Sequence, residues 1–400
     1  MKVLITGAHF TPAQAVIEEL VKSGSADMRS MTLRDRRVGD SDVDIVYVGR
    51  KSTREGDKTP SIESQVLPKM GVKFVPIIAG RMRRYISIGT FVSLFKIPIG
   101  FIHAFIILLK EKPDVVVSFG GYVAVPVVFN AWLLNIPIII HEQTLVSGLA
   151  NTFSALFADK IAVSFNGNYS FNKDKILVTG NPMRKKIINP VAKGSNEIEE
   201  MISKAEKHKK PLILVTGGNQ GAHSVNLLIE EALPELLKKY VVVHQTGDSS
   251  FKDYERLLEM RSRNEFGMTA GIVSPSMYLP MKWISEDDMG RLYQNIDLAI
   301  SRCGANTLLE LSFHQVPTIM IPLAFVTKDE QTKNAKYFSA KGLGKMLIQK
   351  GLTAKKLVVE IEEIVTDKKF KENAKNAKEV VILDAEKKLA QEILLLEYKV

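Results

Sequence analysis

Two stretches of the chain begin alike, and their recurrence constrains the fold more than any other feature. Residues 2–6 (KVLIT) and 211–216 (PLILVT) are short apolar runs, each followed by glycine and then by a helical pattern. Buried strands that alternate with amphipathic helices are typical of a parallel α/β sheet. The restart after residue 210 therefore predicts two doubly wound, Rossmann-like α/β domains that face one another across a cleft.

Length and composition agree with two domains. The 400 residues exceed what one core usually organises, and a hydrophobic content of 46% is that of a globular protein. We expect an N-terminal domain over residues 1–180, a second domain over 181–375, and a C-terminal helix over 376–400 that returns to the first domain. The polar stretch 189–210 is expected to be a linker or an outer helix.

Residues 301–335 carry the clearest sign of a ligand. The buried-strand pattern IDLAI ends there, the chain turns at Gly304, and helical spacing starts at Thr307. A helix that starts just beyond a parallel strand directs free N–H groups and its positive dipole end into the crevice, where a diphosphate would bind. Glu310 could accept hydrogen bonds from two ribose hydroxyls. The alternative is an ordinary helix with Glu310 as a solvated charge.

Four loops at strand ends are expected to converge on one ligand site. They are TGAH at 6–9, SFGGY at 118–122, HEQT at 141–144 and TGGNQGAH at 216–223. His9 is a candidate general base because imidazole titrates near neutrality, although a lone histidine is more often a structural hydrogen-bonding group. His141 and Glu142 follow an apolar run, so they belong either to a site or to a buried polar network.

Residues 81–110 are unusually apolar, with arginines at their start. The apolar part is about long enough to cross a bilayer, but it contains Pro98 and leads directly into another buried-strand pattern. We therefore predict two helices that form a surface in the membrane interface. Its residues would be Arg81, Arg83, Arg84, Phe91, Leu94 and Phe95. The alternative is that the apolar side chains belong to the domain core.

Net charge indicates the kind of ligand or partner, and the cysteine count bears on disulfides. The 54 Lys and Arg residues exceed the 44 Asp and Glu residues, which gives a net charge of +10. This excess favours phosphates or lipid headgroups, and no zinc spacing or RNA-binding aromatic motif favours nucleic acid. The single cysteine, Cys303, excludes an internal disulfide and is interpreted as a small packed side chain.

Two further features bear on location and metal binding. The start of the chain lacks the parts of a secretory signal, so we expect a cytoplasmic protein. Asp287 and Asp288 lie at an apparent helix start, where capping is the better interpretation, and no metal site is predicted.

Seven sequence blocks, in family order, resemble the bacterial lipid-linked N-acetylglucosaminyltransferases of peptidoglycan synthesis, in glycosyltransferase family 28. The blocks are FGGYVAVPVVFNAWLLNIPIIIHEQ, GLANTFSALFADKIAVSF, VTGNPMR, VTGGNQGAHSVN, HQTG, DLAISRCGANTLLEL and DEQTKNA. The resemblance implies a GT-B fold and transfer from UDP-N-acetylglucosamine to the lipid-linked muramoyl-pentapeptide, converting lipid I to lipid II. It also implies peripheral attachment to the cytoplasmic face of the cell membrane, with no metal or other cofactor required.

The resemblance implies site residues as well. The catalytic residues would be His9 and Glu142. The donor would contact Thr6, Gly7, Ala8, Thr144, Arg184, Gly218, Asn219, Gln220, Ile284, Ala305, Asn306, Thr307, Leu308, Leu309, Glu310 and Gln331. The acceptor would contact Gly120, Gly121, Tyr122, His141 and Gln143. In the donor set, Arg184 and the amides of 305–309 would face the diphosphate, and Ile284 would contact the uracil. Glu310 would bind the ribose, and Gln331 would bind the transferred sugar.

Three departures from the family pattern motivate alternatives. The first loop reads TGAHF rather than GGGTGGH, Thr144 stands in place of an asparagine, and Asn219 in place of a serine. One alternative is a transferase that uses another glycolipid acceptor, such as diacylglycerol. Another is an NAD-dependent sugar-nucleotide epimerase, suggested by MKVLITGA but without the GxxG and YxxxK motifs of that family. The last is a non-catalytic sugar-nucleotide or membrane-binding scaffold.

Overall fold

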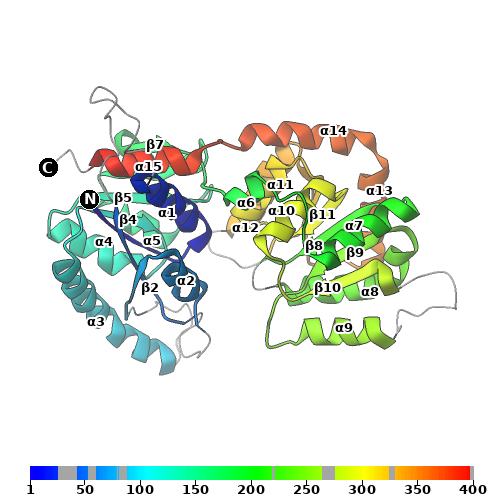
Figure 1. The fold of residues 1–400 in the computed structure, drawn as a ribbon, viewed down its shortest axis with the longest axis horizontal. Coiled ribbons are helices and arrows are strands. Elements are labelled where there is room, and N and C mark those ends of the chain that lie inside the picture. The colour runs from blue at the N-terminus through cyan, green and yellow to red at the C-terminus, as the bar shows by residue number, and fades with distance from the viewer. Residues whose placement is uncertain are drawn as a thin grey trace. The chain divides into compact units, whose positions relative to one another are not determined.

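The chain folds into two units, each built on one parallel sheet (Figure 1). This computed structural model describes residues 1–25, 43–52, 60–78, 80, 88–218, 221–263, 275–323 and 329–396, and only the backbone of 23–25, 88–96, 263 and 275. The N-terminal unit comprises Met1–Met183 and Ile382–Val400, and the C-terminal unit comprises Arg184–Val381. The prediction of two doubly wound domains is confirmed.

The N-terminal sheet has the strand order β3-β2-β1-β4-β5-β6-β7. Its strands are β1 (Lys2–Gly7), β2 (Asp44–Gly49), β3 (Lys73–Pro76), β4 (Val115–Phe119), β5 (Ile138–Glu142), β6 (Lys160–Val163) and β7 (Ile176–Val178). Its helices are α1 (Phe10–Ser25), α2 (Ile62–Val66), η1 (Leu67–Met70), α3 (Ile88–Glu111), α4 (Ala124–Leu133), α5 (Leu149–Ser154), η2 (Lys173–Lys175) and α15 (Ala385–Leu396). The order reverses between β1 and β4, which pair in parallel with Thr6 opposite Ser118.

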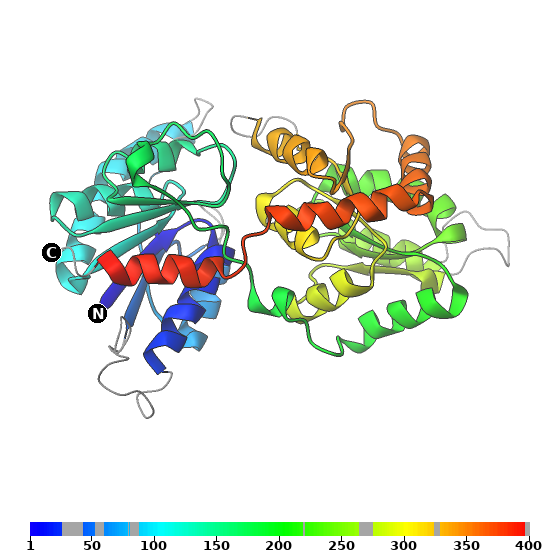
Figure 2. The same ribbon diagram turned by 90° about the horizontal axis from the view of Figure 1, so that it is seen from above.

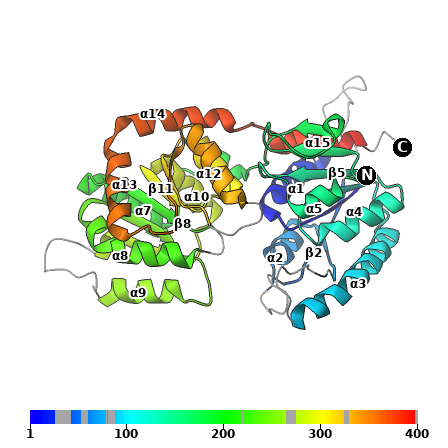
Figure 3. The same cartoon turned by 180° about the vertical axis from the view of Figure 1, so that it is seen from behind.

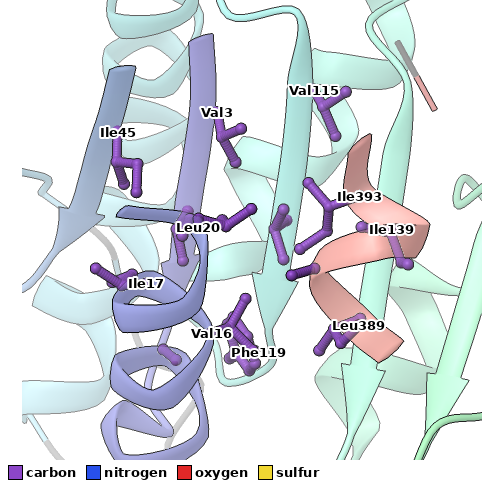
Figure 4. Packing of buried hydrophobic residues seen from close by; sticks show 14 of the residues in the cluster. Val3, Val16, Ile17, Leu20, Ile45, Val115, Phe119, Ile139, Leu389 and Ile393 are labelled. Atoms are coloured by element: carbon purple, nitrogen blue, oxygen red, sulfur yellow. The ribbon is translucent and has the colours of Figure 1, made fainter. Parts of the chain in front are cut away.

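The core of this unit lies on both faces of its sheet, because successive strand residues point to opposite sides. Val3 and Ile5 of β1 pack with α1 and α15, whereas Leu4 packs with α3 and α4. Figure 4 shows Leu389 and Ile393 of α15 in the same cluster as the side chains of α1, and Figure 2 shows α15 next to α1. Burial of each such aliphatic side chain stabilises the fold by about 1.5–3 kcal/mol, which anchors α15 in the N-terminal unit.

The C-terminal sheet has the order β10-β9-β8-β11-β12-β13, again all parallel. Its strands are β8 (Leu212–Thr216), β9 (Val241–Gln245), β10 (Tyr278–Met281), β11 (Leu298–Ser301), β12 (Thr318–Met320) and β13 (Gly344–Met346). Its helices are α6 (Lys185–Ile188), α7 (Asn196–His208), α8 (His223–Lys239), α9 (Asp253–Arg263), η3 (Pro275–Met277), α10 (Glu286–Asn295), α11 (Ala305–Phe313), α12 (Glu330–Ala340), α13 (Ala354–Thr366), α14 (Lys368–Asn376) and η5 (Ala377–Val380). Here the order reverses between β8 and β11.

One prediction about helices is wrong. Residues 88–111 form a single 24-residue helix, α3, with Pro98 inside it, instead of two helices. A proline removes one amide donor, which the remaining backbone hydrogen bonds of a long helix can outweigh. The buried face that follows it, with Ala104 and Leu108, holds the helix on the sheet. No helix in the described parts of the chain is long and apolar enough to cross a membrane.

The polar stretch 189–210 contains α7, an outer helix. Its apolar side chains Ile198, Met201 and Ile202 are buried, while its charged residues face outward. A helix with one apolar stripe packs that stripe on a sheet and leaves the polar face in solvent. Figure 3 shows the helices of each unit from behind, with α3, α4 and α5 together in the N-terminal unit.

Candidate functional site

The reversals of strand order place the glycine loops at the carboxyl ends of adjacent strands. In the N-terminal unit, the amide of Ala8, after β1, donates to the carbonyl of Gly120, after β4, at 2.9 Å. A Cβ on Gly121 would lie 2.5 Å from Cβ of Ala8, and Gly121 has φ +82, so a side chain there would be both crowded and strained. The predicted loops 6–9 and 118–122 are therefore in contact, as a crevice at a switch point requires.

The Glu142 carboxylate organises the loop after β5. Its Oε1 accepts from the Thr144 amide at 3.1 Å and lies 2.8 Å from the Thr144 hydroxyl. Its Oε2 accepts from the Gly148 amide at 3.1 Å and from Nδ2 of Asn151 at 2.9 Å. A carboxylate has about four lone-pair directions, and these contacts use them. The geometry thus favours loop organisation over the catalytic role predicted for Glu142.

His9 is exposed and contacts one side chain of that loop. Its Nδ1 lies 2.7 Å from Nε2 of Gln143. Gln143 was expected to contact the acceptor, and the structure places it beside the predicted base. Tyr122, also in the expected acceptor set, has its hydroxyl 3.4 Å from a guanidinium nitrogen of Arg50.

His141 is buried and belongs to a polar network. Its Nε2 lies 3.3 Å from the carbonyl oxygen of Gly180 and 3.4 Å from Oγ of Ser164. Burial lowers the pKa of His141 to about 4, so the ring is neutral near pH 7. Of the two interpretations open for this residue, the geometry favours the structural network.

In the C-terminal unit, the glycine loop after β8 is shaped by close backbone approaches. A Cβ on Gly221 would lie 2.0 Å from the carbonyl oxygen of Thr246, and Gly221 has φ +72, so only glycine fits there. A Cβ on Gly218 would meet nothing within 4 Å. The predicted donor residues Asn219 and Gln220 lie outside the described residues.

Helix α11 begins directly after β11 with Gly304 as its N-cap. Gly304 has no side chain, so no side chain of the N-cap residue caps this end, where a helix directs its first N–H groups outward. The amide of Leu308 donates to the carbonyl of Gly304 at 3.1 Å, and the side chains of Leu308 and Leu309 are buried. The Leu308 donor is thus used within the helix, and the expectation that the amides of 305–309 face a diphosphate stays a prediction.

Glu310 is only 3% exposed and is held by two side chains. Its Oε1 accepts from Nε and Nη2 of Arg184 at 3.1 and 2.8 Å. Its Oε2 accepts from Nη2 of Arg184 at 2.9 Å and from the Tyr293 hydroxyl at 3.2 Å. Burial alone would lower the pKa of Arg184, but the Glu310 carboxylate holds it above its ordinary value. The two residues predicted to take the phosphates and the ribose thus pair with each other. The solvated alternative for Glu310 is wrong.

Gln331 lies in the first turn of α12 and hydrogen-bonds to the segments that follow β11 and β12. Its Oε1 accepts from the amide of Leu323 at 2.9 Å and from that of Cys303 at 3.4 Å. Asn334 donates to the carbonyl of Cys303 at 3.0 Å from the next turn of α12. These contacts hold the start of α12 beside the start of α11. Cys303 itself is buried, which raises the pKa of its thiol, as expected for a packed side chain.

The residues assigned to uracil and to capping lie around α10. Ile284 is buried between β10 and this helix. Ser285 caps α10 through the amide of Asp288, and the Asp288 carboxylate accepts from the Ser195 amide at 2.7 Å. Asp288 therefore has a structural role. Among the described residues, no group of three His, Cys, Asp or Glu side chains could hold a metal ion.

The sequence reasoning missed Arg302, the residue before Cys303. Its side chain is 6% exposed and donates to the carbonyls of Ile321 and Pro322 at 3.1 and 3.3 Å and to the Ser224 hydroxyl at 2.8 Å. In the described parts of the chain no carboxylate forms an ion pair with it. Burial lowers the pKa of Arg302, yet an arginine stays charged in proteins. The available signal was a charged residue directly after the apolar run that forms β11 (Leu298–Ser301).

The predicted membrane residues are only partly described. Arg81, Arg83 and Arg84 lie outside the described residues, and the side chains of Phe91, Leu94 and Phe95 are not described. Further along α3, however, large apolar side chains are exposed, with Ile102 at 63%. Others follow on α4 and around α5. The set, here called the apolar face, is Ile99, Ile102, Ile106, Leu109, Trp132, Leu133, Phe153 and Leu156.

Two doubly wound domains, each with glycine loops and a helix start at its point of strand reversal, define a protein of the GT-B class. The sequence models of the glycosyltransferase family 28 N-terminal and C-terminal domains match residues 58–163 and 212–393. The chain belongs to glycosyltransferase family 28.

Individual relatives match over nearly the whole chain. One is UDP-N-acetylglucosamine–N-acetylmuramyl-(pentapeptide) pyrophosphoryl-undecaprenol N-acetylglucosamine transferase 2 of Bacillus cereus, 31% identical, with 91% of each chain covered. The transferase of Bacillus cytotoxicus that bears the same name without a number is 31% identical, with 97% of each chain covered. The crystal structure of Acinetobacter baumannii MurG superposes with a TM-score of 0.67 at 23% identity, covering 98% of this chain and 99% of that one.

Proposed function

We propose that the protein transfers N-acetylglucosamine from UDP-N-acetylglucosamine to the 4-hydroxyl of lipid-linked N-acetylmuramoyl-pentapeptide, with inversion at C1. The observation that carries this proposal is the match to relatives named for this transfer over 97% of both chains, across both units. The loops at the two strand reversals carry the residues predicted to supply the chemistry of the transfer, which supports the proposal. The donor is a substrate, and the proposal requires no resident cofactor.

The reaction needs a base for the acceptor and stabilisation for the leaving group. We assign the base to His9, which takes the proton of the 4-hydroxyl as that oxygen forms its bond to C1 of the donor sugar. The bond between C1 and the diphosphate oxygen breaks, and its electron pair leaves with UDP. The first-turn amides of α11 and the Arg184 guanidinium would stabilise the charge that develops on the diphosphate.

Donor binding on the C-terminal unit requires an exchange of partners. The lone pairs of Glu310 are taken by Arg184 and Tyr293, so ribose hydroxyls must replace some of these contacts. A released Arg184 is then free to pair with the diphosphate. Both residues carry the charge that suits these ligands, which supports the predicted roles of phosphate binding for Arg184 and ribose binding for Glu310. The other donor and acceptor residues stay predictions.

The acceptor assay tests the function directly. Radiolabelled UDP-N-acetylglucosamine should release UDP and label the lipid when lipid I is supplied, and diacylglycerol should give no product. The diacylglycerol arm matters because Thr144 replaces the asparagine expected from the family pattern, and here Thr144 is buried and its hydroxyl donates to Glu142. Transfer to diacylglycerol but not to lipid I would overturn the acceptor assignment, and donor binding without any UDP release would overturn the activity.

Arg302 offers a prediction about charge. Because it is a buried cation at the start of α11, it should favour an anionic ligand without contacting the nucleoside. We expect Arg302→Gln to weaken UDP binding by about tenfold, on the scale of one charged hydrogen bond, and to leave uridine binding unchanged. Isothermal titration with both ligands measures the ratio. An equal loss for UDP and uridine would show a general disturbance of the site instead.

The apolar face supports peripheral attachment of the N-terminal unit to the cytoplasmic side of the cell membrane. Exposed apolar patches of this kind mark contact surfaces, and interfacial helices insert such side chains among lipid headgroups. The basic residues Lys110 and Lys112 lie at the end of α3 and could meet anionic headgroups.

Vesicle binding tests this surface. Replacing Ile102 and Ile106 together by serine should abolish co-sedimentation with anionic vesicles, because each apolar side chain lost to the bilayer removes about 1.5–3 kcal/mol of binding. A matched control is Ile348→Ser, an exposed apolar residue of the C-terminal unit. Full retention of binding by the double variant, with the control also unchanged, would place the membrane contact elsewhere.

A further inference from the structure

The contact between His9 and Gln143 joins the predicted base to a neighbouring amide. Nδ1 of His9 lies 2.7 Å from Nε2 of Gln143, within hydrogen-bond range. His9 precedes α1 and Gln143 follows β5, so the contact bridges two loops of the N-terminal unit. The inference below rests on the proposed function, because it concerns how His9 serves as the base.

Only one ring nitrogen of His9 is available to the hydroxyl of the acceptor sugar. Nδ1 is occupied by Gln143, so Nε2 must take the proton from the sugar hydroxyl. A neutral imidazole carries its hydrogen on one nitrogen and a lone pair on the other. A lone pair on Nε2 therefore requires the hydrogen on Nδ1, and a hydrogen on Nδ1 requires an acceptor beside it.

Gln143 can supply that acceptor by turning its amide. When the amide nitrogen of Gln143 faces the ring, it donates a hydrogen bond and Nδ1 of His9 must accept it. The ring hydrogen of neutral His9 then sits on its Nε2, so this nitrogen cannot act as a base. In that orientation Oε1 of Gln143 is buried without a hydrogen-bond partner in the part of the chain that the structure describes. A half-turn of the amide exchanges the two atoms in the same volume and places Oε1 at Nδ1.

We propose that Gln143 is a positioning residue whose Oε1 accepts the Nδ1 hydrogen of His9 and so keeps Nε2 of His9 as the proton acceptor. This is the role that a carboxylate has beside the histidine of a hydrolase triad, performed by a neutral amide. The titratable groups that interact electrostatically with His9 are Glu142, whose carboxylate is held by loop donors, and His141, which is buried and neutral. Neither group hydrogen-bonds to the His9 ring within the part of the chain that the structure describes.

Nitrogen NMR of the full-length protein labelled with 15N-histidine reads the tautomer without substrate. The His9 signals are assigned by their absence in His9→Gln. We expect wild-type His9, at a pH where it is neutral, to carry its hydrogen on Nδ1. In Gln143→Leu the population with the hydrogen on Nε2 should rise, and kcat should fall by about tenfold or more, because a general base contributes about 10²–10⁴-fold. KM for UDP-N-acetylglucosamine should stay the same.

The isostere Gln143→Glu supplies a second readout. A carboxylate can only accept, so the Nδ1 hydrogen is kept and kcat should remain within a few fold of wild type. Its negative charge stabilises the imidazolium and raises the pKa of His9. Activity requires neutral His9, so the acidic limb of the kcat/KM profile should move to higher pH. Gln65→Leu, an exposed amide on α2, is the control and should change neither readout.

The outcomes separate this inference from the proposed function. A wild-type His9 with its hydrogen on Nε2, or a tautomer unchanged in Gln143→Leu, would overturn the inference even in an active enzyme. A hydrogen on Nδ1 that depends on Gln143, in a protein that never transfers sugar to lipid I, would support the contact and reject the function. Thermal unfolding of each variant shows whether it is folded, and Gln143→Glu keeps the test decisive if Gln143→Leu does not fold.

Discussion

Glu310→Ala is expected to weaken UDP binding by about a hundredfold or more, the largest effect we predict on the donor side. The carboxylate would lose two hydrogen bonds to ribose hydroxyls, and hydrogen bonds to charged groups contribute about 1.5–3 kcal/mol each. The variant also leaves Arg184 and the Tyr293 hydroxyl without the partner that both contact at Glu310. Isothermal titration with UDP measures the change in affinity.

The same substitution should lower stability, so the ligand effect needs its own control. Removing one partner of a buried ion pair costs about 3–5 kcal/mol, and Glu310 is buried while Arg184 is partly so. The control therefore changes the ligand instead of the protein. Wild-type protein should bind 2′-deoxy-UDP about tenfold more weakly than UDP, as loss of one hydrogen bond to a charged group implies. Glu310→Ala should no longer distinguish them, and a wild type that binds both equally would refute ribose binding by Glu310.

His9→Asn is expected to reduce kcat by about 10²–10⁴-fold, the contribution of a general base. Asparagine can still contact Gln143 but cannot take a proton near neutral pH. Since His9 is exposed, we expect little change in the free energy of unfolding, and UDP affinity should stay within a few fold of wild type.

Steady-state turnover with lipid I measures the change in kcat, and thermal unfolding measures the change in stability. The comparison variant is His208→Asn, a histidine at the end of α7 in the C-terminal unit, which should leave kcat unaltered. Turnover by His9→Asn at the wild-type rate would remove His9 from the chemistry. The base would then have to be sought among other groups of the N-terminal unit.

Much of the fold follows from local sequence patterns. The apolar runs that precede glycine, such as KVLIT and LILVT, form β1 and β8, and the amphipathic spacing of 354–396 forms α13, α14 and α15. These features depend on neighbours close in sequence, where periodicity and turn residues act directly. The same reasoning gave a wrong prediction at Pro98. A proline is a local helix breaker, but here the long helix and its packed face keep the helix continuous.

The sequence predicts a location for the candidate site but does not predict its hydrogen bonds. Glycine loops after strands and a helix start after IDLAI indicate where a ligand belongs, because parallel strands end at one edge. The saturation of Glu142 by its own loop and the pairing of Arg184 with Glu310 join residues that sequence spacing does not relate. Arg302 was missed for this reason, since its meaning depends on the carbonyls of Ile321 and Pro322.

The sequence by itself determined that this chain builds two parallel α/β domains with glycine turns at their strand ends, because those signals are local and periodic. Tertiary structure alone decided which polar groups are free for ligands and which are already bonded, because that choice depends on side chains brought together from distant elements. Glu310 pairs with Arg184 across 126 positions of sequence, and His9 meets Gln143 across 134. Such contacts have no periodic signature, so only the folded chain can assign their chemistry.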